Sequence, residues 1–371
     1  MEQIRTAVIG FGGMGSKYAR MLYDGEIEGM TLAGVCCRNA QGQAILRQEY
    51  GGVSVYQDVE DALAHGDQFD AAVIVTPHTS HVKIGKAMVA AGKHILVDKP
   101  AGIWTRNVRE LIGAAKEAGV SFGMIFNMRM DPVFQKAKEL LDQGVLGRIS
   151  RVVWLCNTWY RTPAYHYSAP WRSSWKGECG GLLINQSQHY LDLLQWLVGM
   201  PDGLLATLDY GKYNNFNVDD SADIQFFYNS GIHGTFISST GENPGVNRLE
   251  LWGPKGRMTI EDNSRLFLDE NVVSTEDFAA ENKEIYGVLE HHVREIFVEK
   301  DEQAYQKVFK NFADHLLTGT PLMADGQEGL KSLIMTNGAY LSSWLDKRLS
   351  LPVDEDLFLE KLLEKRGRKM W

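Results

Sequence analysis

The residues of this chain best suited to proton transfer lie in the stretch 180–198, GGLLINQSQHYLDLLQWLV. Its spacing places Asn185, His189 and Asp192 at i, i+4 and i+7, so a helix over this stretch carries all three side chains on one face. The other residues are mostly apolar, which predicts a largely buried helix whose polar groups need partners or a cavity. His189 is therefore the first candidate for general acid–base chemistry, and the alternative is a histidine satisfied within the core.

A lysine follows a second apolar run, in the segment HILVDKP at 94–100. Lys99 stands directly before Pro100 and after Asp98. A lysine at the mouth of a cleft can donate to a substrate hydroxyl and stabilise the negative charge that develops on its oxygen. The alternative is an exposed loop lysine paired with Asp98.

A glycine-rich loop follows a short apolar strand pattern and leads into a helix-forming segment, which is the setting that the G-x-G-x-x-G dinucleotide motif requires. Gly10 would make the tight turn, Gly12 would let a pyrophosphate approach the backbone, and Gly15 would let helix and strand pack closely. The start of the helix would supply N–H groups to the phosphates. The residues expected to contact the cofactor here are Gly10, Gly12, Gly13, Met14 and Gly15.

The next strand pattern, at 31–39, ends where NAD-specific proteins usually carry an acidic residue for the ribose hydroxyls. This chain has Cys36, Cys37 and Arg38 there. No carboxylate is present to repel a 2′-phosphate, and Arg38 could bind one or stack on the adenine of either cofactor. We expect NAD(H) contacted by Cys37 and Arg38, and the pattern also permits NADP(H).

Strand patterns at 71–77, 94–100 and 120–126 alternate with helix patterns at 79–91 and 105–118. This alternation predicts a parallel sheet with helices on both faces and with ligands at the carboxyl ends of its strands. The sequence gives no useful metal spacing, so no metal site is expected. The residues at these strand ends expected to line the cofactor or substrate cleft are Thr76, Pro77, His78, Lys99 and Asn127.

After a helix at 131–143 the pattern becomes β-like. Alternating or concentrated apolar and β-branched residues predict a second, α+β domain with a large open, mainly antiparallel sheet, followed by helices at 302–317 and 327–346. The strands are expected at 148–159, 221–228, 231–238 and 247–253. The expected division is a Rossmann domain at 1–126, a substrate-binding and oligomerisation domain at 127–350 and a C-terminal tail at 351–371.

The segment 160–181, YRTPAYHYSAPWRSSWKGECGG, is too rich in aromatic and basic residues for an ordinary solvated loop. Aromatic faces with nearby donors suit the CH-rich faces and hydroxyls of a sugar or an aromatic glycoside. The alternatives are an oligomer contact or a loop packed on its own domain. The residues expected to bind substrate here are Tyr160, Trp171, Arg172 and Trp175.

The composition is that of an ordinary globular protein, with 371 residues, 44% hydrophobic and 23% charged. A net charge of -9 argues against nucleic-acid binding, which needs clustered Lys and Arg. The basic residues at 365–369 are expected to form a solvated tail. Four cysteines without zinc or disulfide spacing, and the lack of a signal-peptide or membrane-spanning pattern, predict a cytoplasmic protein that does not bind membranes.

The glycine loop, DKP and GGLLINQSQHYLD together resemble the Gfo/Idh/MocA oxidoreductases in order and approximate spacing, over nearly the whole length. The resemblance implies a Rossmann domain followed by an α/β domain whose open sheet often mediates oligomerisation. It matches Lys99 to the lysine of the family's E-K-P motif and His189 to the usual proton-transfer histidine. Asn185 stands where many members have Asp, and Asp98 replaces the commoner Glu.

This resemblance implies an NAD(P)-dependent dehydrogenase that moves hydride between a nicotinamide and a ring hydroxyl of a sugar, glycoside or cyclitol. In the expected mechanism His189 takes the hydroxyl proton, Lys99 stabilises the oxygen and Asn185 holds it by hydrogen bonding. The specific expectation is oxidation at C3 of a glucoside by a homo-oligomer that associates through the second-domain sheet. The alternatives are an inositol dehydrogenase, a redox-assisted glycosidase and a non-catalytic dinucleotide-binding sensor.

Overall fold

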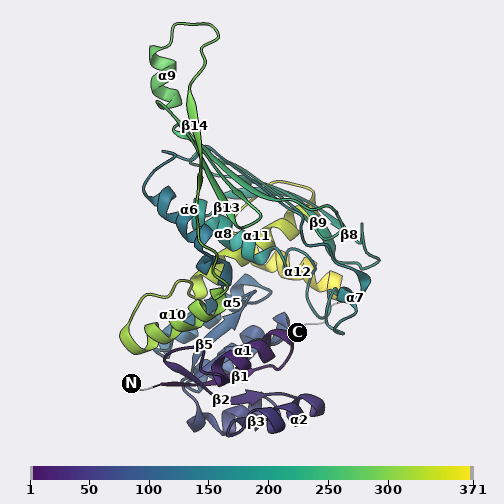
Figure 1. Cartoon of the computed structure of the whole chain (residues 1–371). Coiled ribbons are helices and arrows are strands. Elements are labelled where there is room, and N and C mark those ends of the chain that lie inside the picture. Colours follow the sequence, from purple (N-terminus) through teal and green to yellow (C-terminus); the bar gives the residue numbers. More distant parts are fainter. Residues whose placement is uncertain (1–2, 368–371) are drawn as a thin grey trace.

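A computed structural model describes residues 3–367, and its N-terminal part is a six-stranded parallel sheet in the order β3-β2-β1-β4-β5-β6 (Figure 1). Consecutive residues of the central strand β1 point to opposite faces, and Ala7, Val8 and Ile9 are all fully buried. Such continuous apolar strands are typical of a sheet covered on both faces. The strands are β1 (Ile4–Ile9), β2 (Met30–Cys36), β3 (Ser54–Tyr56), β4 (Ala71–Ile74), β5 (His94–Asp98) and β6 (Phe122–Ile125).

Helices cover both faces of this sheet, as the alternating pattern predicts. One face also receives a helix from late in the sequence, because the rings of Tyr18 and Phe309 pack with centroids 5.2 Å apart. Residues 304–318 were expected in the second domain, but their apolar stripe completes the Rossmann core instead. One face is covered by α1 (Gly13–Tyr23), α2 (Ala40–Glu49) and α10 (Ala304–Thr318), the other by α3 (Val59–Ala64), α4 (His81–Ala90) and α5 (Thr105–Glu117).

The second part is a nine-stranded sheet in the order β14-β13-β12-β11-β7-β10-β9-β8-β15, antiparallel except between β7 and β10. Residues of β7 alternate between exposed or half-buried and buried, which is the pattern of a sheet with one covered face. Trp154 on that face packs on Phe134 and Tyr190. The covering helices are α6 (Pro132–Asp142), α8 (Gln188–Val198) and α11 (Gly326–Leu345).

The strands of this sheet include four that the sequence patterns did not indicate, besides the short final one. Two of them have only six residues each and include charged side chains, and alternation alone does not separate such short strands from loops. The strands are β7 (Arg151–Cys156), β8 (Gly203–Tyr210), β9 (Asp219–Phe227), β10 (His233–Ser239), β11 (Asn247–Gly253), β12 (Gly256–Glu261), β13 (Arg265–Asn271), β14 (His291–Ile296) and β15 (Leu349–Ser350).

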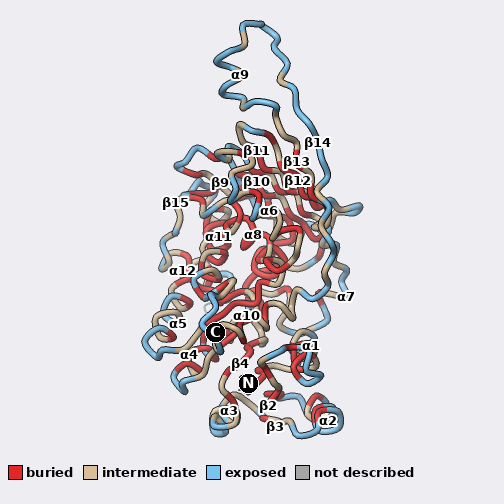
Figure 2. The backbone as a smooth tube through the Cα atoms, turned by 60° about the vertical axis from the view of Figure 1, so that its left-hand side comes forward, coloured by how far each residue is buried: buried red, intermediate tan, exposed pale blue. Residues whose placement is uncertain are grey.

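A long arm leaves the body of the protein between β13 and β14 and carries the short helix α9 (Thr275–Glu281) (Figure 1). Figure 2 shows this arm almost entirely in the colour of exposed residues. Ile285 and Tyr286 in the arm are 90% and 91% exposed, and Phe297, directly after β14 (His291–Ile296), is 90% exposed. Large apolar side chains displayed this way are unusual for a surface that meets only water.

The C-terminal segment packs on the body of the protein. Of the basic residues expected in a solvated tail, Lys365 is exposed as expected, but Arg366 is buried. Helix α12 (Glu355–Arg366) buries Phe358 and Leu362, and the indole of Trp104 donates to the Glu355 carbonyl oxygen at 2.9 Å. Arg366 is only 5% exposed and donates to the Trp175 carbonyl oxygen at 2.8 Å. The remaining basic residues 368 and 369 lie outside the described residues. Between residues 3 and 367, no helix is both long enough and apolar enough to cross a membrane.

Candidate active site

The stretch that carries the candidate histidine is a turn followed by a helix. Helix α8 begins at Gln188, and residues 182–187 are turns, so Asn185 precedes the helix instead of sharing its face with His189. This corrects the expectation of one helix over 180–198. Turn and helix nevertheless place both side chains near the same edge of the Rossmann sheet.

A buried carboxylate explains why the chain turns before α8. Asp219 accepts hydrogen bonds from the backbone N–H groups of Gly181 and Leu183, each at 2.7 Å, and from the Tyr340 hydroxyl at 2.7 Å. A Cβ atom at Gly180 would lie 2.1 Å from the Tyr340 oxygen. The two glycines therefore let the chain pass close to α11 and β9, and Asp219 satisfies the N–H groups that this turn leaves unpaired.

Lys99 reaches across from the carboxyl end of β5 to this turn. Its Nζ donates to the carbonyl oxygen and to Oδ1 of Asn185, both at 2.8 Å. Asp98 accepts the backbone N–H of Lys99 at 2.8 Å and the Tyr18 hydroxyl at 3.5 Å, but not the Lys99 ammonium, so the alternative of a loop lysine whose ammonium binds Asp98 is not what the structure shows. Burial lowers the pKa of Lys99, while the negative charges of Asp98 and Glu178 act in the opposite direction.

Glu178 is the member of this cluster that the sequence analysis did not select. It is 1% exposed, its Oε1 accepts from Asn185 Nδ2 at 2.6 Å, and its Oε2 accepts from the Ser173 N–H at 2.6 Å. Burial raises its pKa to about 7. A signal was present, because Glu178 is the only acidic residue in the segment 160–181.

His189 is not a satisfied core histidine, because its Nδ1 is buried without a hydrogen-bond partner. Burial, and then the positive charge of Lys99, lower its pKa to about 3, so the imidazole is neutral near pH 7. Two more buried atoms without partners, Asn127 Oδ1 and His78 Nδ1, lie at the ends of β6 and β4. Buried polar atoms are normally paired, and three that are not mark this edge as a place for a ligand.

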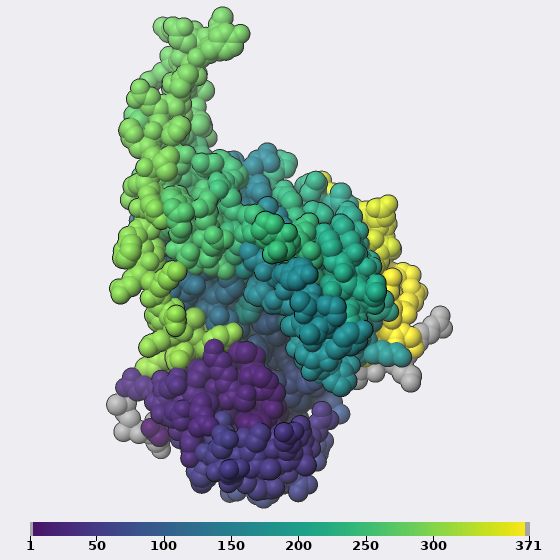
Figure 3. Space-filling view, turned by 45° about the vertical axis from the view of Figure 1, so that its right-hand side comes forward, coloured from purple at the N-terminus to yellow at the C-terminus, as the bar shows by residue number. Residues whose placement is uncertain are grey.

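The aromatic loop lies over this edge. The Trp171 ring contacts the His78 ring edge to face at 5.4 Å, which joins the loop to the Rossmann domain. The Tyr165 hydroxyl accepts from Asn185 at 3.2 Å, from Gln186 at 2.8 Å and from Arg172 at 2.6 Å. Figure 3 shows the surface hollowed between the purple Rossmann domain and the teal part that contains this loop.

Two other aromatic residues of the loop lie elsewhere. Trp175 is 4% exposed, packs on Tyr340, and donates to the Asn217 carbonyl oxygen at 2.6 Å, so it serves the core and not the cleft. Tyr160 is 53% exposed. It belongs to a separate surface cavity of about 290 Å³ lined also by Arg161, Pro163, Tyr167, Tyr213, Asn214, Asn215, Phe216 and Gly241.

The glycine loop fits a dinucleotide. Gly10 has a φ of 110°, and a Cβ there would lie 2.8 Å from the Val75 carbonyl oxygen; a Cβ at Gly15 would lie 2.0 Å from the Gly10 oxygen. At Gly12 and Gly13 a Cβ would meet nothing within 4 Å. Gly12 caps α1 without any side-chain bond, and the first turn, which includes Met14, has no acidic residue. The N–H groups at this helix start are therefore free for phosphate oxygens.

At the adenosine end of the cofactor site, only one of the two expected side chains, Cys37 and Arg38, is placed to contact a cofactor. Cys37 is 4% exposed under α2, where a Cβ at Gly42 would lie 2.6 Å from its sulfur, so its side chain cannot reach a cofactor. Arg38 is exposed and forms no hydrogen bond or ion pair with residues 3–367. Of the two expected contacts, only Arg38 can use its side chain.

The ends of β4 and β5 are tied together beside the loop. His81 lies between the carbonyl oxygens of Thr76 and Pro100, at 2.6 Å and 2.8 Å, and Ser80 donates to the Thr76 hydroxyl at 2.7 Å. Thr76 and Pro77 are half-buried at this edge. These bonds hold the strand end that carries Lys99 against the strand end that precedes His78.

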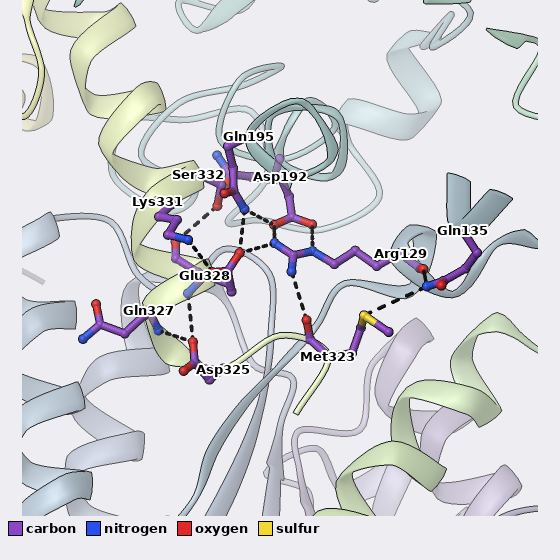
Figure 4. Close-up of polar contacts among 12 residues, drawn as sticks. Arg129, Gln135, Asp192, Gln195, Met323, Asp325, Gln327, Glu328, Lys331 and Ser332 are labelled. Carbon is purple, nitrogen blue, oxygen red and sulfur yellow. Dashed lines mark hydrogen bonds and ion pairs between the residues drawn. The ribbon is translucent and has the colours of Figure 1, made fainter. Parts of the chain in front are cut away.

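A second polar cluster fixes α8 at its other side (Figure 4). Arg129 is 1% exposed and donates to both carboxylate oxygens of Asp192, at 2.8 Å and 2.6 Å, to Glu328 at 2.5 Å and to the Met323 carbonyl oxygen at 2.9 Å. Gln195 adds a hydrogen bond to Glu328 at 2.8 Å. Asp192 is thus a structural carboxylate that joins α8 to the end of β6 and to α11.

Comparison with known proteins agrees with this architecture. The oxidoreductase family with an NAD-binding Rossmann fold matches residues 4–126. The GFO/IDH/MocA C-terminal domain matches residues 134–259, so the two together cover more than half of the chain.

Individual proteins resemble the chain over nearly its whole length. Myo-inositol 2-dehydrogenase of Thermotoga maritima is 24% identical over 362 residues, which cover 95% of this chain and 99% of that protein. The structure is similar to that of the WlbA dehydrogenase from Bordetella pertussis in complex with NADH and UDP-GlcNAcA, with a TM-score of 0.79, 24% identity, and coverage of 95% of this chain and 100% of that one. It is also similar to levoglucosan dehydrogenase in complex with NADH and levoglucosan, with a TM-score of 0.78, 17% identity and coverage of 95% and 100%. Together with the glycine loop, the two family matches show that the chain belongs to the GFO/IDH/MocA family of oxidoreductases with an NAD-binding Rossmann fold.

Proposed function

We propose that this protein oxidises a ring hydroxyl of a sugar or glycoside and passes the hydride to a nicotinamide. The observation that carries the proposal is that Lys99 and His189 lie near one another at the carboxyl edge of the parallel sheet. The two lie close enough for the Lys99 charge to lower the pKa of His189, and His189 has a buried nitrogen without a partner. One cationic donor beside one neutral acceptor suits the oxygen and the proton of an alcohol.

The roles of the residues follow from their hydrogen bonds. An ammonium group has three N–H donors, and Asn185 takes two of those of Lys99 through its two oxygens. The third donor remains for the substrate oxygen, on which negative charge develops. The neutral imidazole of His189 accepts the hydroxyl proton, and Asn127 offers its unpaired Oδ1 to another hydroxyl. A bound nicotinamide supplies the hydride acceptor.

The substrate class is supported by the aromatic loop. Tyr165, Trp171 and Arg172 lie over the reactive edge and combine apolar faces with donors, as recognition of a pyranose ring requires. The names of similar proteins, an inositol dehydrogenase and a levoglucosan dehydrogenase, point to cyclic polyols as well. Within this class we propose C3 of a glucoside, and an inositol is the second candidate.

Absorbance of the reduced nicotinamide tests this function. Purified protein with NAD is mixed separately with methyl glucoside, salicin, glucose and myo-inositol. We expect the band of the reduced cofactor to rise with the two glucosides and a 3-keto glycoside to accumulate. A larger rate with myo-inositol than with the glucosides would assign myo-inositol as the substrate. Release of the salicin aglycone without accumulation of reduced cofactor would indicate a redox-assisted glycosidase. No response to any member of the panel would contradict the proposal and favour a dinucleotide-binding sensor.

The cofactor site can be tested apart from turnover. In Gly12→Ala the new methyl group meets nothing within 4 Å, so the protein should fold, but the methyl group narrows the approach to the start of α1. We expect NAD to bind at least about tenfold more weakly, measured by titration calorimetry. Gly113→Ala, where a Cβ also meets nothing within 4 Å, is the matched control and should leave binding unchanged. Equal affinities in both variants would contradict the assignment.

We propose further that the protein is a homo-oligomer. The family resemblance favours contacts through the second-domain sheet, and the arm between β13 and β14 exposes Ile285, Tyr286 and Val288. A second copy would cover these side chains. Replacing residues 273–290 by a short Gly-Ser turn should reduce the molar mass measured by light scattering. An unchanged mass would show that the arm is not part of the interface.

A cytoplasmic location is the last part of the proposal. Cys36, Cys37, Cys156 and Cys179 are all buried as free thiols, which suits a reducing compartment. Burial raises the pKa of Cys36 to about 12, so this thiol does not readily form the reactive thiolate. Fractionation of the source cells should recover the protein with cytoplasmic markers, and recovery from the exterior would contradict this location.

A further inference from the structure

We propose that Glu178 is a positioning residue, whose carboxylate acts through the Asn185 amide to hold the Lys99 ammonium ready for the substrate oxygen. The part of the proposal that concerns turnover rests on the function proposed above. The part that concerns Lys99 itself can be tested without any substrate.

The amide of Asn185 connects the other two groups. Its Nδ2 donates to Glu178 at 2.6 Å, while its Oδ1 accepts from Lys99 Nζ at 2.8 Å. The reverse orientation of the amide would set N–H donors against the ammonium group and an oxygen against the carboxylate. The charge of Glu178 therefore fixes which end of the Asn185 amide faces Lys99.

The rest of Glu178 is arranged to be an acceptor. Its second oxygen takes the Ser173 N–H at 2.6 Å, and Arg172 lies 3.8 Å from the first, so both oxygens face donors only. The residue is 1% exposed, and a charge in such an enclosed place acts on its neighbours with little screening by water.

The charges around Lys99 show why this carboxylate matters. Arg172 and Arg161 oppose the ammonium charge of Lys99, and the carboxylates of Asp98 and Glu178 favour it. Removing the negative charge of Glu178 leaves an excess of positive charge, which drives Lys99 toward its neutral form. The titratable and charged side chains around Glu178 itself are those of Arg172, Lys99, Tyr165, Cys179 and, next to the Glu178 backbone, His78.

This arrangement predicts a pH dependence of the reaction. Because the pKa of Glu178 is about 7, its carboxylate is protonated below neutral pH and no longer fixes the Asn185 amide. His189, with a pKa of about 3, does not titrate in that range. The acidic limb of the rate profile should therefore belong to Glu178 and not to His189.

The direct test measures the proton affinity of Lys99 in the full chain without substrate. Acetic anhydride is pulsed onto the protein across a pH series, and mass spectrometry follows acetylation of Lys99. In Glu178→Gln the proton affinity of Lys99 should fall about tenfold or more. Asp223→Asn, which removes a carboxylate from the exposed face of β9, is the matched control and should leave it unchanged. An unchanged affinity in Glu178→Gln, or an equal fall in the control, would overturn the proposal.

A double variant provides the second test. In Glu178→Gln the new amide can accept from only one of Ser173 and Asn185, and it sets an N–H donor against the other. In Glu178→Gln with Asn185→Asp every group is paired again. The introduced glutamine accepts from the Ser173 N–H and donates to the introduced aspartate, and the carboxylate of that aspartate contacts the Lys99 ammonium.

The second test uses any sugar that the wild type oxidises. Glu178→Gln should reduce kcat/KM about 10- to 100-fold, and the fall in rate of the wild type below about pH 7 should disappear. The double variant should recover most of this rate. Its rate should fall only at a lower pH, because the carboxylate of the introduced aspartate contacts the Lys99 ammonium. A limb that stays near pH 7 in either variant, or a double variant no faster than the single one, would overturn the positioning role. If no sugar is oxidised by the wild type, the proposed function fails, while the labelling result still decides the role of Glu178.

Discussion

Two polar clusters lie on opposite sides of helix α8, and they differ in how completely their hydrogen-bonding groups are paired. On one side Arg129, Asp192 and Glu328 satisfy one another, with two hydrogen bonds between Arg129 and Asp192 and one between Arg129 and Glu328. On the other side Lys99 keeps one unused donor, and His189 has a buried nitrogen without a partner.

The difference teaches how structural and reactive polar groups can be distinguished within one core. A buried ion cluster whose donors and acceptors are all paired is rigid and holds elements together. A cluster with vacant donors and acceptors bears an energetic cost, which a bound ligand can remove by supplying the missing partners. The first description applies to Asp192 and the second to His189, although both residues stand on α8.

The largest effect should come from the reactive side. Lys99→Met keeps much of the side-chain volume but removes the donor and the charge next to the substrate oxygen. We expect kcat to fall about a thousandfold, while the unfolding temperature changes little, because removal of a buried charge offsets the loss of two hydrogen bonds to Asn185. Steady-state kinetics and calorimetry on one preparation measure both. A loss of activity that merely follows a loss of folded protein would break the comparison.

The structural side should show the opposite pattern. Arg129→Met leaves Asp192 buried without its partner, and we expect the free energy of unfolding to fall by about 3–5 kcal/mol. Urea denaturation gives this value. Lys136→Met, which removes an exposed ion pair with Glu139 on α6, is the control and should unfold like the wild type. An Arg129→Met protein as stable as the control would show that the cluster is not structural.

The smallest effect concerns how the free energy of unfolding depends on pH, which should differ between Glu328 and Glu178. Burial opposes ionisation of Glu328, but hydrogen bonds from Lys331 and Arg129 outweigh it and lower its pKa to about 2. Glu328 therefore stabilises the fold above roughly pH 4.3, its unfolded pKa, and this contribution is lost as pH falls toward about 2. Glu178, with its pKa raised to about 7, favours the fold most when protonated, and that contribution is lost as pH rises through about 7.

Urea denaturation of Glu328→Gln and Glu178→Gln across pH measures this contrast. Relative to wild type, Glu328→Gln should be less stable near neutral pH by about 1–3 kcal/mol, and the deficit should shrink as pH falls below about 4. Glu178→Gln should gain stability relative to wild type by about 1–3 kcal/mol as pH rises from about 4 to about 8. Parallel curves for the two variants would mean that the two clusters do not differ in this way.

The fold and the candidate residues Lys99 and His189 could be identified from the sequence because they depend on local patterns. The alternating strands and helices, the glycine loop and the apolar run before Lys99 each appear within a short window. The parallel sheet and the mainly antiparallel sheet are both confirmed. The position of α10 could not be inferred in this way, because an amphipathic stripe does not reveal which of two sheets it covers.

The details of the site depend on contacts between distant residues, which a single sequence does not contain. Trp175 and Tyr165 are equally aromatic members of one loop, yet Tyr340 and Asn217 hold the first in the core while Asn185 and Arg172 hold the second at the site. Likewise Asn185 precedes the helix because Asp219, on β9, pairs with the turn. Of these details, only the importance of Glu178 could have been noticed in the sequence, because Glu178 is the one carboxylate of residues 160–181.

The central claim is that the vacant nitrogen of His189 takes part in the reaction. The most direct test is the single-turnover rate of nicotinamide reduction in His189→Ala, measured by stopped-flow absorbance with the best sugar of the panel and with NAD saturating. We predict a rate at least about a hundredfold below that of the wild type, with unchanged NAD affinity and unfolding temperature. A rate close to that of the wild type would contradict the account.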